Sequence, residues 1–277
     1  MDYHYYDYDD DSDEQEQYAE PELTLDEEVD ALITKPSADR DDLQTPIDEQ
    51  IFFRYNTVNL IIGKRGSGKT YSTMREILKM LVLMKDENKY TQIHYITDKQ
   101  RDDTVDMFKP AFEKLGFFFN WVSTNNAEEI INTLTTLKAW VSDKDWVAEN
   151  PEDYEIVCQV LNCEPDTMPH TLMIFDDCIG LFNHATTLSK KLFENRQSRI
   201  TYFLLLQDVQ GISPSMKSNI DSLTLFGGFP RHKFQTLFYQ LPPVDLTYEQ
   251  YSNLNTSDAV RIDYIESSVK FLIRNKT

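Results

Sequence analysis

The chain has 277 residues and a formal net charge of −20, with 47 acidic and 27 basic residues. The charge is uneven: residues 1–50 contain 19 Asp and Glu against Lys35 and Arg40, a net of −17, which leaves −3 for residues 51–277. This balance argues against a tight monomeric DNA binder, which needs a strongly basic surface. No apolar run approaches the roughly 20 residues that span a bilayer, so we expect no membrane partner.

The N-terminal segment is the most acidic part of the chain. Residues 1–42 lack the apolar side chains needed to offset the entropy cost of ordering, and tyrosines are scattered among the acids. We therefore predict a largely disordered acidic tail over residues 1–50 and one domain over residues 51–277. The tail is either a solvated solubility segment, a docking segment for a basic partner surface, or a competitor with nucleic acid for a basic channel.

The cysteines and the N-terminus indicate the compartment. Cys158, Cys163 and Cys178 are an odd number, with neither a second close pair nor a nearby His pair for zinc, so we expect free thiols in a reducing environment. The acidic N-terminus is unlike a signal or transit peptide. A cytosolic or nuclear protein is therefore expected.

The first predicted strand, residues 58–62, leads into a glycine-rich loop of sequence GKRGSGKT. The loop fills every fixed position of the phosphate-binding pattern G-x-x-x-x-G-K-[ST], and a predicted helix over residues 71–82 follows it. A chance glycine-rich turn is the alternative, but strand, loop and helix come in the required order. In this interpretation backbone N–H groups face the phosphates, Lys69 reaches phosphoryl oxygens and Thr70 ligates Mg²⁺. The predicted nucleotide-binding residues are Gly63, Lys64, Arg65, Gly66, Ser67, Gly68, Lys69 and Thr70.

Strands and helices then alternate along the chain, which indicates an α/β fold: a P-loop NTPase with a mainly parallel central sheet flanked by helices. Strands are predicted at residues 91–97 and 117–122, helices at residues 104–115 and 127–141, and a polar connecting insertion at residues 143–162.

A short apolar run at residues 171–175 ends in two carboxylates, Asp176 and Asp177. It predicts a buried central strand with acids at its carboxyl end, the edge where open parallel sheets carry their active sites. Asp176 would hold magnesium opposite Thr70, and Asp177 would orient or deprotonate the attacking water. An acidic strand end is common by itself, and the phosphate loop upstream makes the pair specific.

A basic helix over residues 186–199 and a buried strand over residues 200–206 follow, and that strand ends at Gln207. We place this strand beside the Asp176 strand, where the Gln207 amide either contacts the γ-phosphate or the water, or simply ends the strand. The positive charge needed in the transition state would come from Arg196 or Arg199 of a neighbouring subunit, or from Arg65 in cis; each is otherwise a solvated surface arginine. A short strand at residues 223–226 and a C-terminal β-hairpin at residues 260–265 and 269–273 complete the predicted elements.

Four stretches carry a resemblance to a known family: IIGKRGSGKT, LMIFDDC, ENRQSRITYFLLLQDVQGISPSMKSNIDSLTLFGGF and FYQLPPV. Together they resemble the viral genome-packaging ATPases of the FtsK/HerA class, the type found in nucleocytoplasmic large DNA viruses, virophages and related elements. The third stretch is the most discriminating, and the match spans residues 50–245. The resemblance implies ATP and Mg²⁺ as cofactors, a homo-oligomeric ring motor on double-stranded DNA, Gln207 as a sensor and an arginine of residues 195–199 acting in trans.

The leading hypothesis is thus a Mg²⁺- and ATP-dependent translocase that packages a viral genome into a preformed capsid. It would act in the cytosol or nucleus of the host cell, at the assembly site, or in the virion, and its tail would dock on a capsid or portal protein. Two alternatives stay open: a nucleotide-binding assembly or scaffold protein with slow turnover, and a P-loop kinase with an acceptor site in residues 143–162. The candidate DNA-contacting residues are Lys190, Lys191, Arg196, Arg199, Lys217, Arg231 and Lys233.

Overall fold

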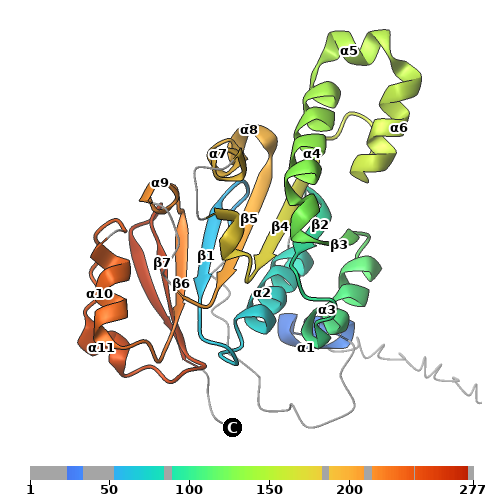
Figure 1. The fold of residues 1–277 in the computed structure, drawn as a ribbon. Helices are drawn as coiled ribbons and strands as arrows, with labels where there is room; N and C mark the ends of the chain where they lie inside the picture. The colour runs from blue at the N-terminus through green and yellow to red at the C-terminus, as the bar shows by residue number, and fades with distance from the viewer. Residues whose placement is uncertain are drawn as a thin grey trace, which may run out of the picture.

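A computed structural model describes residues 24–33, 53–83, 89–182, 187–208, 214–239 and 241–273. Its centre is an eight-stranded sheet of order β3-β2-β4-β5-β1-β6-β7-β8 (Figure 1). Neighbouring strands from β3 to β6 run parallel, whereas β7 and β8 are antiparallel. The strands are β1 (Val58–Ile62), β2 (Tyr90–Ile96), β3 (Phe118–Val122), β4 (His170–Asp176), β5 (Ile200–Leu206), β6 (Ser222–Phe226), β7 (Ala259–Asp263) and β8 (Ser268–Leu272). The predicted mainly parallel α/β fold and its C-terminal hairpin are confirmed.

Helices cover both faces of the sheet, because the central strands are apolar on both sides. The helices are α1 (Leu25–Leu32), α2 (Lys69–Leu83), α3 (Asp103–Lys114), α4 (Ala127–Ser142), α5 (Lys144–Glu149), α6 (Pro151–Leu161), α7 (Thr187–Phe193), α8 (Asn195–Ser198), α9 (Pro214–Lys217), α10 (Arg231–Tyr239) and α11 (Tyr248–Ser252), with 3-10 turns at Thr124–Asn126 and Ile179–Phe182. Leu60 and Ile62 of β1 belong to a buried cluster with residues of α4, α6, α7, α10 and α11, whereas Ile61 between them belongs to a second cluster with residues of α1, α2 and α3. In the described parts of the chain, no helix has the length and apolar character needed to cross a bilayer.

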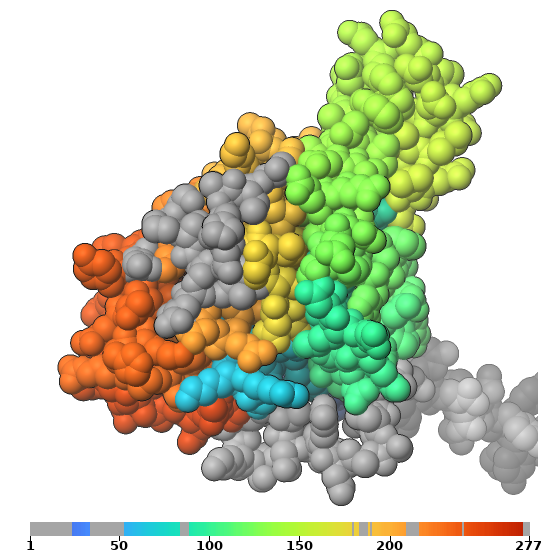
Figure 2. All heavy atoms as spheres, viewed as in Figure 1, coloured from blue at the N-terminus to red at the C-terminus, as the bar shows by residue number. Residues whose placement is uncertain are grey.

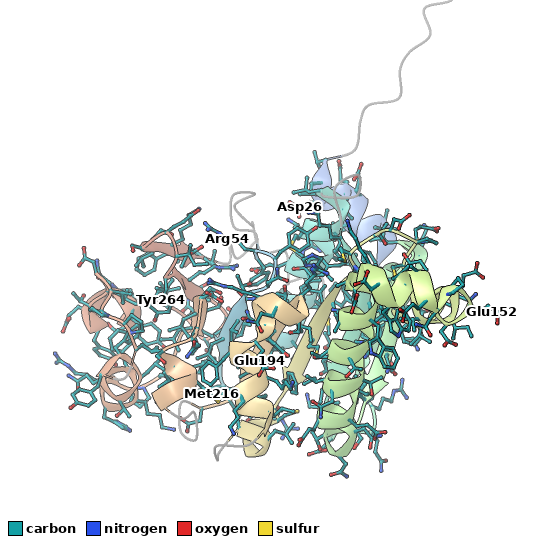
Figure 3. The ribbon with its side chains drawn as sticks, turned by 90° about the horizontal axis from the view of Figure 1, so that it is seen from above. Asp26, Arg54, Glu152, Glu194, Met216 and Tyr264 are labelled. Atoms are coloured by element: carbon teal, nitrogen blue, oxygen red, sulfur yellow. The ribbon has the colours of Figure 1, made fainter. Side chains whose placement is uncertain are left out.

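Residues 143–162 are not the polar connection that the sequence predicted. They form α5 and α6, because the Asp143 side chain caps the first turn of α5 and Pro151 begins α6. With α4 these helices protrude from the body of the molecule (Figure 2), and Glu152 of α6 lies at the opposite end of the molecule from Tyr264 (Figure 3).

The predicted basic helix is interrupted, and three short helices escaped the sequence prediction. Within the described part of residues 186–199, α7 ends at Phe193 and α8 is only four residues long. Arg199 then has a left-handed backbone with φ of 52°, which ends α8 and starts β5. Helices α9, α10 and α11 have at most nine residues, too few for a clear helical period.

Part of the predicted disordered tail is a docked helix. Thr24 and Glu27 form a capping box at the start of α1, and Val29 is completely buried. Asp26 and Asp30 form ion pairs with Arg75 and Lys79 of α2, whose side chains are only 4% and 3% exposed. Buried cations need such partners, so residues 24–33 are an ordered part of the tail that was predicted to be largely disordered. The rest of residues 1–50 lies outside the described chain.

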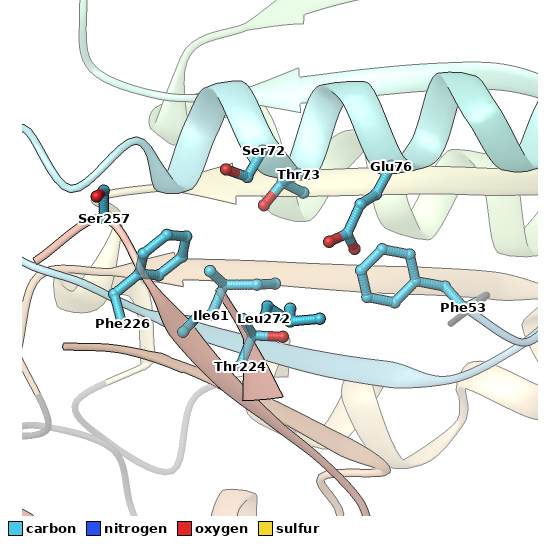
Figure 4. Close-up of a pocket in the computed structure, with 10 residues that line it drawn as sticks. Phe53, Ile61, Ser72, Thr73, Glu76, Thr224, Phe226, Ser257 and Leu272 are labelled. Atoms are coloured by element: carbon cyan, nitrogen blue, oxygen red, sulfur yellow. The ribbon is translucent and has the colours of Figure 1, made fainter. Parts of the chain in front are cut away.

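A second buried ion pair ties α2 to the sheet. Glu76 of α2 lies 3.3 Å from Arg261 of β7, and the Arg261 guanidinium stacks over the Phe53 ring at 3.9 Å. Burial raises the pKa of Glu76, against the opposing charges of Arg261 and Lys79. Thr73 and Glu76 border a cavity of about 20 Å³ (Figure 4), room for about one water molecule and no larger ligand.

We predict that the effect of truncating the tail on stability depends on whether α1 is kept. A variant lacking residues 1–42 should be less stable than one lacking residues 1–23 by about 2–4 kcal/mol, because it uncovers the surface under Val29 and leaves Arg75 and Lys79 without acidic partners. Urea unfolding of both variants measures the difference. Equal midpoints and slopes would contradict the docking of α1.

Candidate nucleotide-binding site

The site forms where three neighbouring parallel strands end. Strand β5 lies between β1 and β4, with Ile62 opposite Leu206 and Asp176 opposite Leu205. The glycine-rich loop after β1, the two acids at the end of β4 and Gln207 after β5 therefore meet at one edge of the sheet. The predicted position of the Gln207 strand beside the Asp176 strand is confirmed.

The glycine-rich loop curls tightly around its own backbone. The Gly63 N–H donates to the Leu206 carbonyl at 3.0 Å, and a Cβ on Gly63 would lie 2.4 Å from the Ser67 Oγ. Gly66 and Gly68 have φ of 80° and 86°, a region that side chains disfavour. Helix α2 begins directly after this curl, so its first N–H groups point toward the loop as an anion-binding end.

A cleft of about 620 Å³ opens at this edge. Basic, acidic and hydroxyl side chains share its wall, which suits a polyanion that carries a cation. The lining residues are Lys64, Arg65, Gly66, Gly68, Lys69, Thr70, Tyr71, Lys99, Asp102, Asp103, Thr104, Asp177 and Gln207.

Asp177 joins the loop to β5. Its backbone is left-handed, with φ of 59°, a conformation that costs a non-glycine residue about 1 kcal/mol. The turn directs its carboxylate away from the strand: Oδ1 lies 3.3 Å from the Lys69 Nζ, and Oδ2 accepts a hydrogen bond from the Gln207 amide at 2.6 Å. Lys69, Asp177 and Gln207, all predicted to act within their own subunit, are thus joined by direct contacts through Asp177.

One oxygen of the Asp176 carboxylate accepts hydrogen bonds from hydroxyl groups, and the other has no hydrogen-bond partner in the described chain. Its side chain is 0% exposed, and Oδ2 accepts from the Thr70 hydroxyl at 3.2 Å and the Tyr95 phenol at 2.5 Å. Burial, reinforced by the charge of Asp176, raises the pKa of Tyr95, which keeps the phenol a donor. The Asp176 Oδ1 and the Ser67 Oγ are buried without a hydrogen-bond partner in the described chain. Such atoms are costly, and the oxygens of Thr70 and Asp176 are ligands that Mg²⁺ prefers, so these residues fit the metal.

Sequence reasoning missed Lys99, in the loop after β2. Its Nζ lies 2.8 Å from the Asp176 Oδ2 and 3.0 Å from the Asp102 Oδ2. Strand β2 pairs in parallel with β4, Ile96 opposite Phe175, so the carboxyl end of β2 belongs to the same edge. The sequence does contain a polar run directly after a predicted strand, but this run points to the site only once the strand order is known.

Arg196 and Arg199 lie far from the cleft of their own chain. Both precede β5, whose seven residues separate them from the cleft edge by about 20 Å, and α8 lies at the other end of the sheet from the β1–α2 loop (Figure 1). Arg199 donates to the Met168 sulfur at 2.8 Å, and Arg196, 76% exposed, lies 3.6 Å from Asp221. Only Arg65 of the three candidate arginines lines the cleft.

The seven candidate DNA-contacting residues do not form a free basic stripe. Lys217 is 3% exposed and burial lowers its pKa, so its prediction as a DNA contact is wrong. Four others are paired with acids: Lys191 with Glu194, Arg196 with Asp221, Arg231 with Glu249, and Lys233 with Asp208.

Solved structures provide the comparison that decides the fold. The chain is similar to B204, the DNA-packaging ATPase from Sulfolobus Turreted Icosahedral Virus, with a TM-score of 0.52 and 14% identity over 79% of this chain and 98% of B204. The fold is that of a P-loop NTPase. The genome packaging NTPase B204 from Sulfolobus turreted icosahedral virus 2 is also similar: its AMP complex has a TM-score of 0.51 and 13% identity, over 79% of this chain and 98% of that one. No protein-family model and no curated protein matches the chain.

We predict different defects for two substitutions in this P-loop site. Asp177→Asn keeps the shape of the side chain but frees Lys69 from its ion pair, so nucleotide affinity should stay within about threefold while turnover falls about 100-fold or more. Lys69→Ala should lose both, because it removes the phosphate contact. Titration with a fluorescent ATP analogue and a phosphate-release assay separate the two effects. Equal loss of binding in both variants would overturn the role given to Asp177.

Proposed function

We propose that this protein is a Mg²⁺-dependent ATPase that moves double-stranded DNA and packages a viral genome into a preformed capsid. One observation carries the ATPase part: a complete phosphate loop, two strand-end carboxylates and a strand-end glutamine meet at one edge of the sheet, with β5 between β1 and β4. The similarity to B204, described as a DNA-packaging ATPase, supports the packaging part, as does the resemblance of the motifs to the FtsK/HerA class.

The phosphates of ATP would lie against the loop N–H groups and the start of α2, with Lys69 on the phosphoryl oxygens. Lys69 would exchange its Asp177 contact for these oxygens. Thr70 and Asp176 would hold Mg²⁺, which neutralises phosphate charge when it is bound.

Asp177 is the base for hydrolysis in this proposal. It accepts a proton from water as the water oxygen bonds to the γ-phosphorus and the bond to ADP breaks. Gln207 holds Oδ2 of Asp177, and the Lys69 contact is on Oδ1, so the carboxylate is fixed at both oxygens before the nucleotide takes over Lys69. Gln207 thereby links the site to the end of β5.

The position of Arg196 and Arg199 favours action in trans. Neither side chain reaches the cleft of its own chain, whereas in a homo-oligomeric ring the α8 end of one subunit is free to face the cleft of the next. The acidic tail would dock on a capsid or portal protein, and the complex would act at the viral assembly site in the host cytosol or nucleus, or in the virion.

The kinase alternative loses its candidate acceptor site. None of residues 143–162 lines the cleft, and α5 and α6 lie at the opposite end of the molecule from the loop between β1 and α2 (Figure 1). A nucleotide-gated assembly protein would share the site described here, so only turnover in the presence of DNA distinguishes it from a motor.

We expect double-stranded DNA to stimulate steady-state ATP hydrolysis with Mg²⁺ by about tenfold or more, since a translocating motor couples turnover to its track. The assay uses the full chain, a variant lacking residues 1–23, and Lys69→Ala as the blank. Nucleotide binding without stimulated turnover in either protein would contradict the autonomous motor and favour the assembly protein.

The same assay tests the trans arginine. Subunits carrying Arg199→Ala or Arg196→Ala are mixed with Lys69→Ala subunits, because a mixed ring rebuilds intact sites from two defective partners. Recovery of activity with one arginine variant identifies the finger. Absence of recovery with both would reject the trans role.

A further inference from the structure

Lys99 stands between the cleft and the acid that fits the metal. Its ammonium contacts the Asp176 Oδ2 at 2.8 Å, the same oxygen that accepts from Thr70, and its side chain is 37% exposed on the cleft side. Around the two strand-end acids the positive charges are therefore divided: Lys69 neutralises Asp177, and Lys99 neutralises Asp176.

The loop holds Lys99 in this place through its backbone and its neighbours. The Lys99 N–H donates to the Thr97 hydroxyl, which donates in turn to the Asp176 carbonyl at 3.2 Å. Asp102, the second partner of the ammonium, accepts from the Thr104 N–H with its other oxygen and so begins α3. Hydrogen bonds thus hold both the backbone of Lys99 and its ammonium, and this keeps the ammonium beside Asp176.

The ammonium stays charged at this position. It lies between two carboxylates, 2.8 Å from the Asp176 Oδ2 and 3.0 Å from the Asp102 Oδ2, and both favour the charged form. A divalent cation that approaches Asp176 alone meets two ammonium groups nearby, those of Lys99 and Lys69. Nucleotide phosphates offer both ammonium groups anionic partners, which removes this repulsion.

We propose that Lys99 competes with magnesium for Asp176 and yields that carboxylate only when phosphate oxygens replace it, so that metal and nucleotide bind together. Lys99 is then a positioning residue that suppresses binding of free metal to the nucleotide-free site. The inference deepens the proposed ATPase function and rests on it for the metal role of Asp176 and Thr70.

The proposal implies that metal binding and nucleotide binding are thermodynamically coupled, and that Lys99 increases the coupling factor. Nucleotide raises metal affinity by the same factor by which metal raises nucleotide affinity. Loss of the ammonium should raise the affinity for free metal and so reduce this factor. A merely structural lysine would do the opposite, because its loss would disorder Asp176 and weaken metal binding in every condition.

The test is a titration of the full chain with Mn²⁺ as the probe, followed by electron paramagnetic resonance of the unbound ion. Without nucleotide, Lys99→Met should bind Mn²⁺ more tightly than the wild type by on the order of tenfold. Lys109→Met is the matched control. It also removes one positive charge, but from α3, where Lys109 lies 3.7 Å from Glu113 and outside the cleft lining. Its Mn²⁺ affinity should equal that of the wild type. Adding Asp176→Asn to Lys99→Met should abolish the gain.

Repeating the titration with a non-hydrolysable ATP analogue gives the coupling factor, which should shrink by a similar ratio in Lys99→Met and remain unchanged in Lys109→Met. Lys99→Gln, which keeps polar contacts with both acids, serves if the methionine variant unfolds. Unchanged or weaker binding of free Mn²⁺ in folded Lys99 variants would overturn the proposal. Failure of the proposed ATPase function would show separately, as wild-type analogue binding that Lys69→Ala does not reduce.

Discussion

A fully buried carboxylate is the constraint on which the site depends. Asp176 ends a strand whose seven residues are all buried, and such a charge is tolerated only with donors around it. Its donors come from three elements: Thr70 from the start of α2, Tyr95 from β2 and Lys99 from the loop after β2. Satisfying one carboxylate therefore fixes the relative positions of the phosphate loop and two strands, and shapes the cleft.

The phosphate-loop helix is itself held by buried ion pairs to two different elements. Asp26 and Asp30 of α1 neutralise Arg75 and Lys79 of α2, and Arg261 of β7 neutralises Glu76 on a neighbouring face of the same helix. These partners come from opposite ends of the chain. The described chain thus uses ion pairs, rather than apolar packing alone, to set the angle of the helix whose N-terminus faces the cleft. Removal of one partner leaves a buried charge, so these contacts specify the position of α2 as well as stabilising it.

Local patterns in the sequence were sufficient for the strands and for most of the site. The strand predicted at residues 200–206 coincides with β5, since a run of only seven apolar, aromatic and β-branched residues has the length and composition of a buried strand. The phosphate loop, Asp176, Asp177 and Gln207 could be found because each lies at or directly after the carboxyl end of a strand of this kind. The helix at residues 24–33 could not be predicted from local patterns, because α1 is stabilised by Arg75 and Lys79, more than 40 positions away. Lys99 escaped for the same reason, since its role exists only through the pairing of β2 with β4.

A structure determined with Mg²⁺ and a non-hydrolysable ATP analogue would show whether one edge of the sheet assembles a phosphate and metal site around Asp176 and Asp177. We expect Lys69 to leave its 3.3 Å contact with Asp177 for phosphate oxygens, and Thr70 and Asp176 to hold the metal. Phosphates bound away from the glycine-rich loop, or a metal without Thr70 and Asp176 around it, would contradict this account.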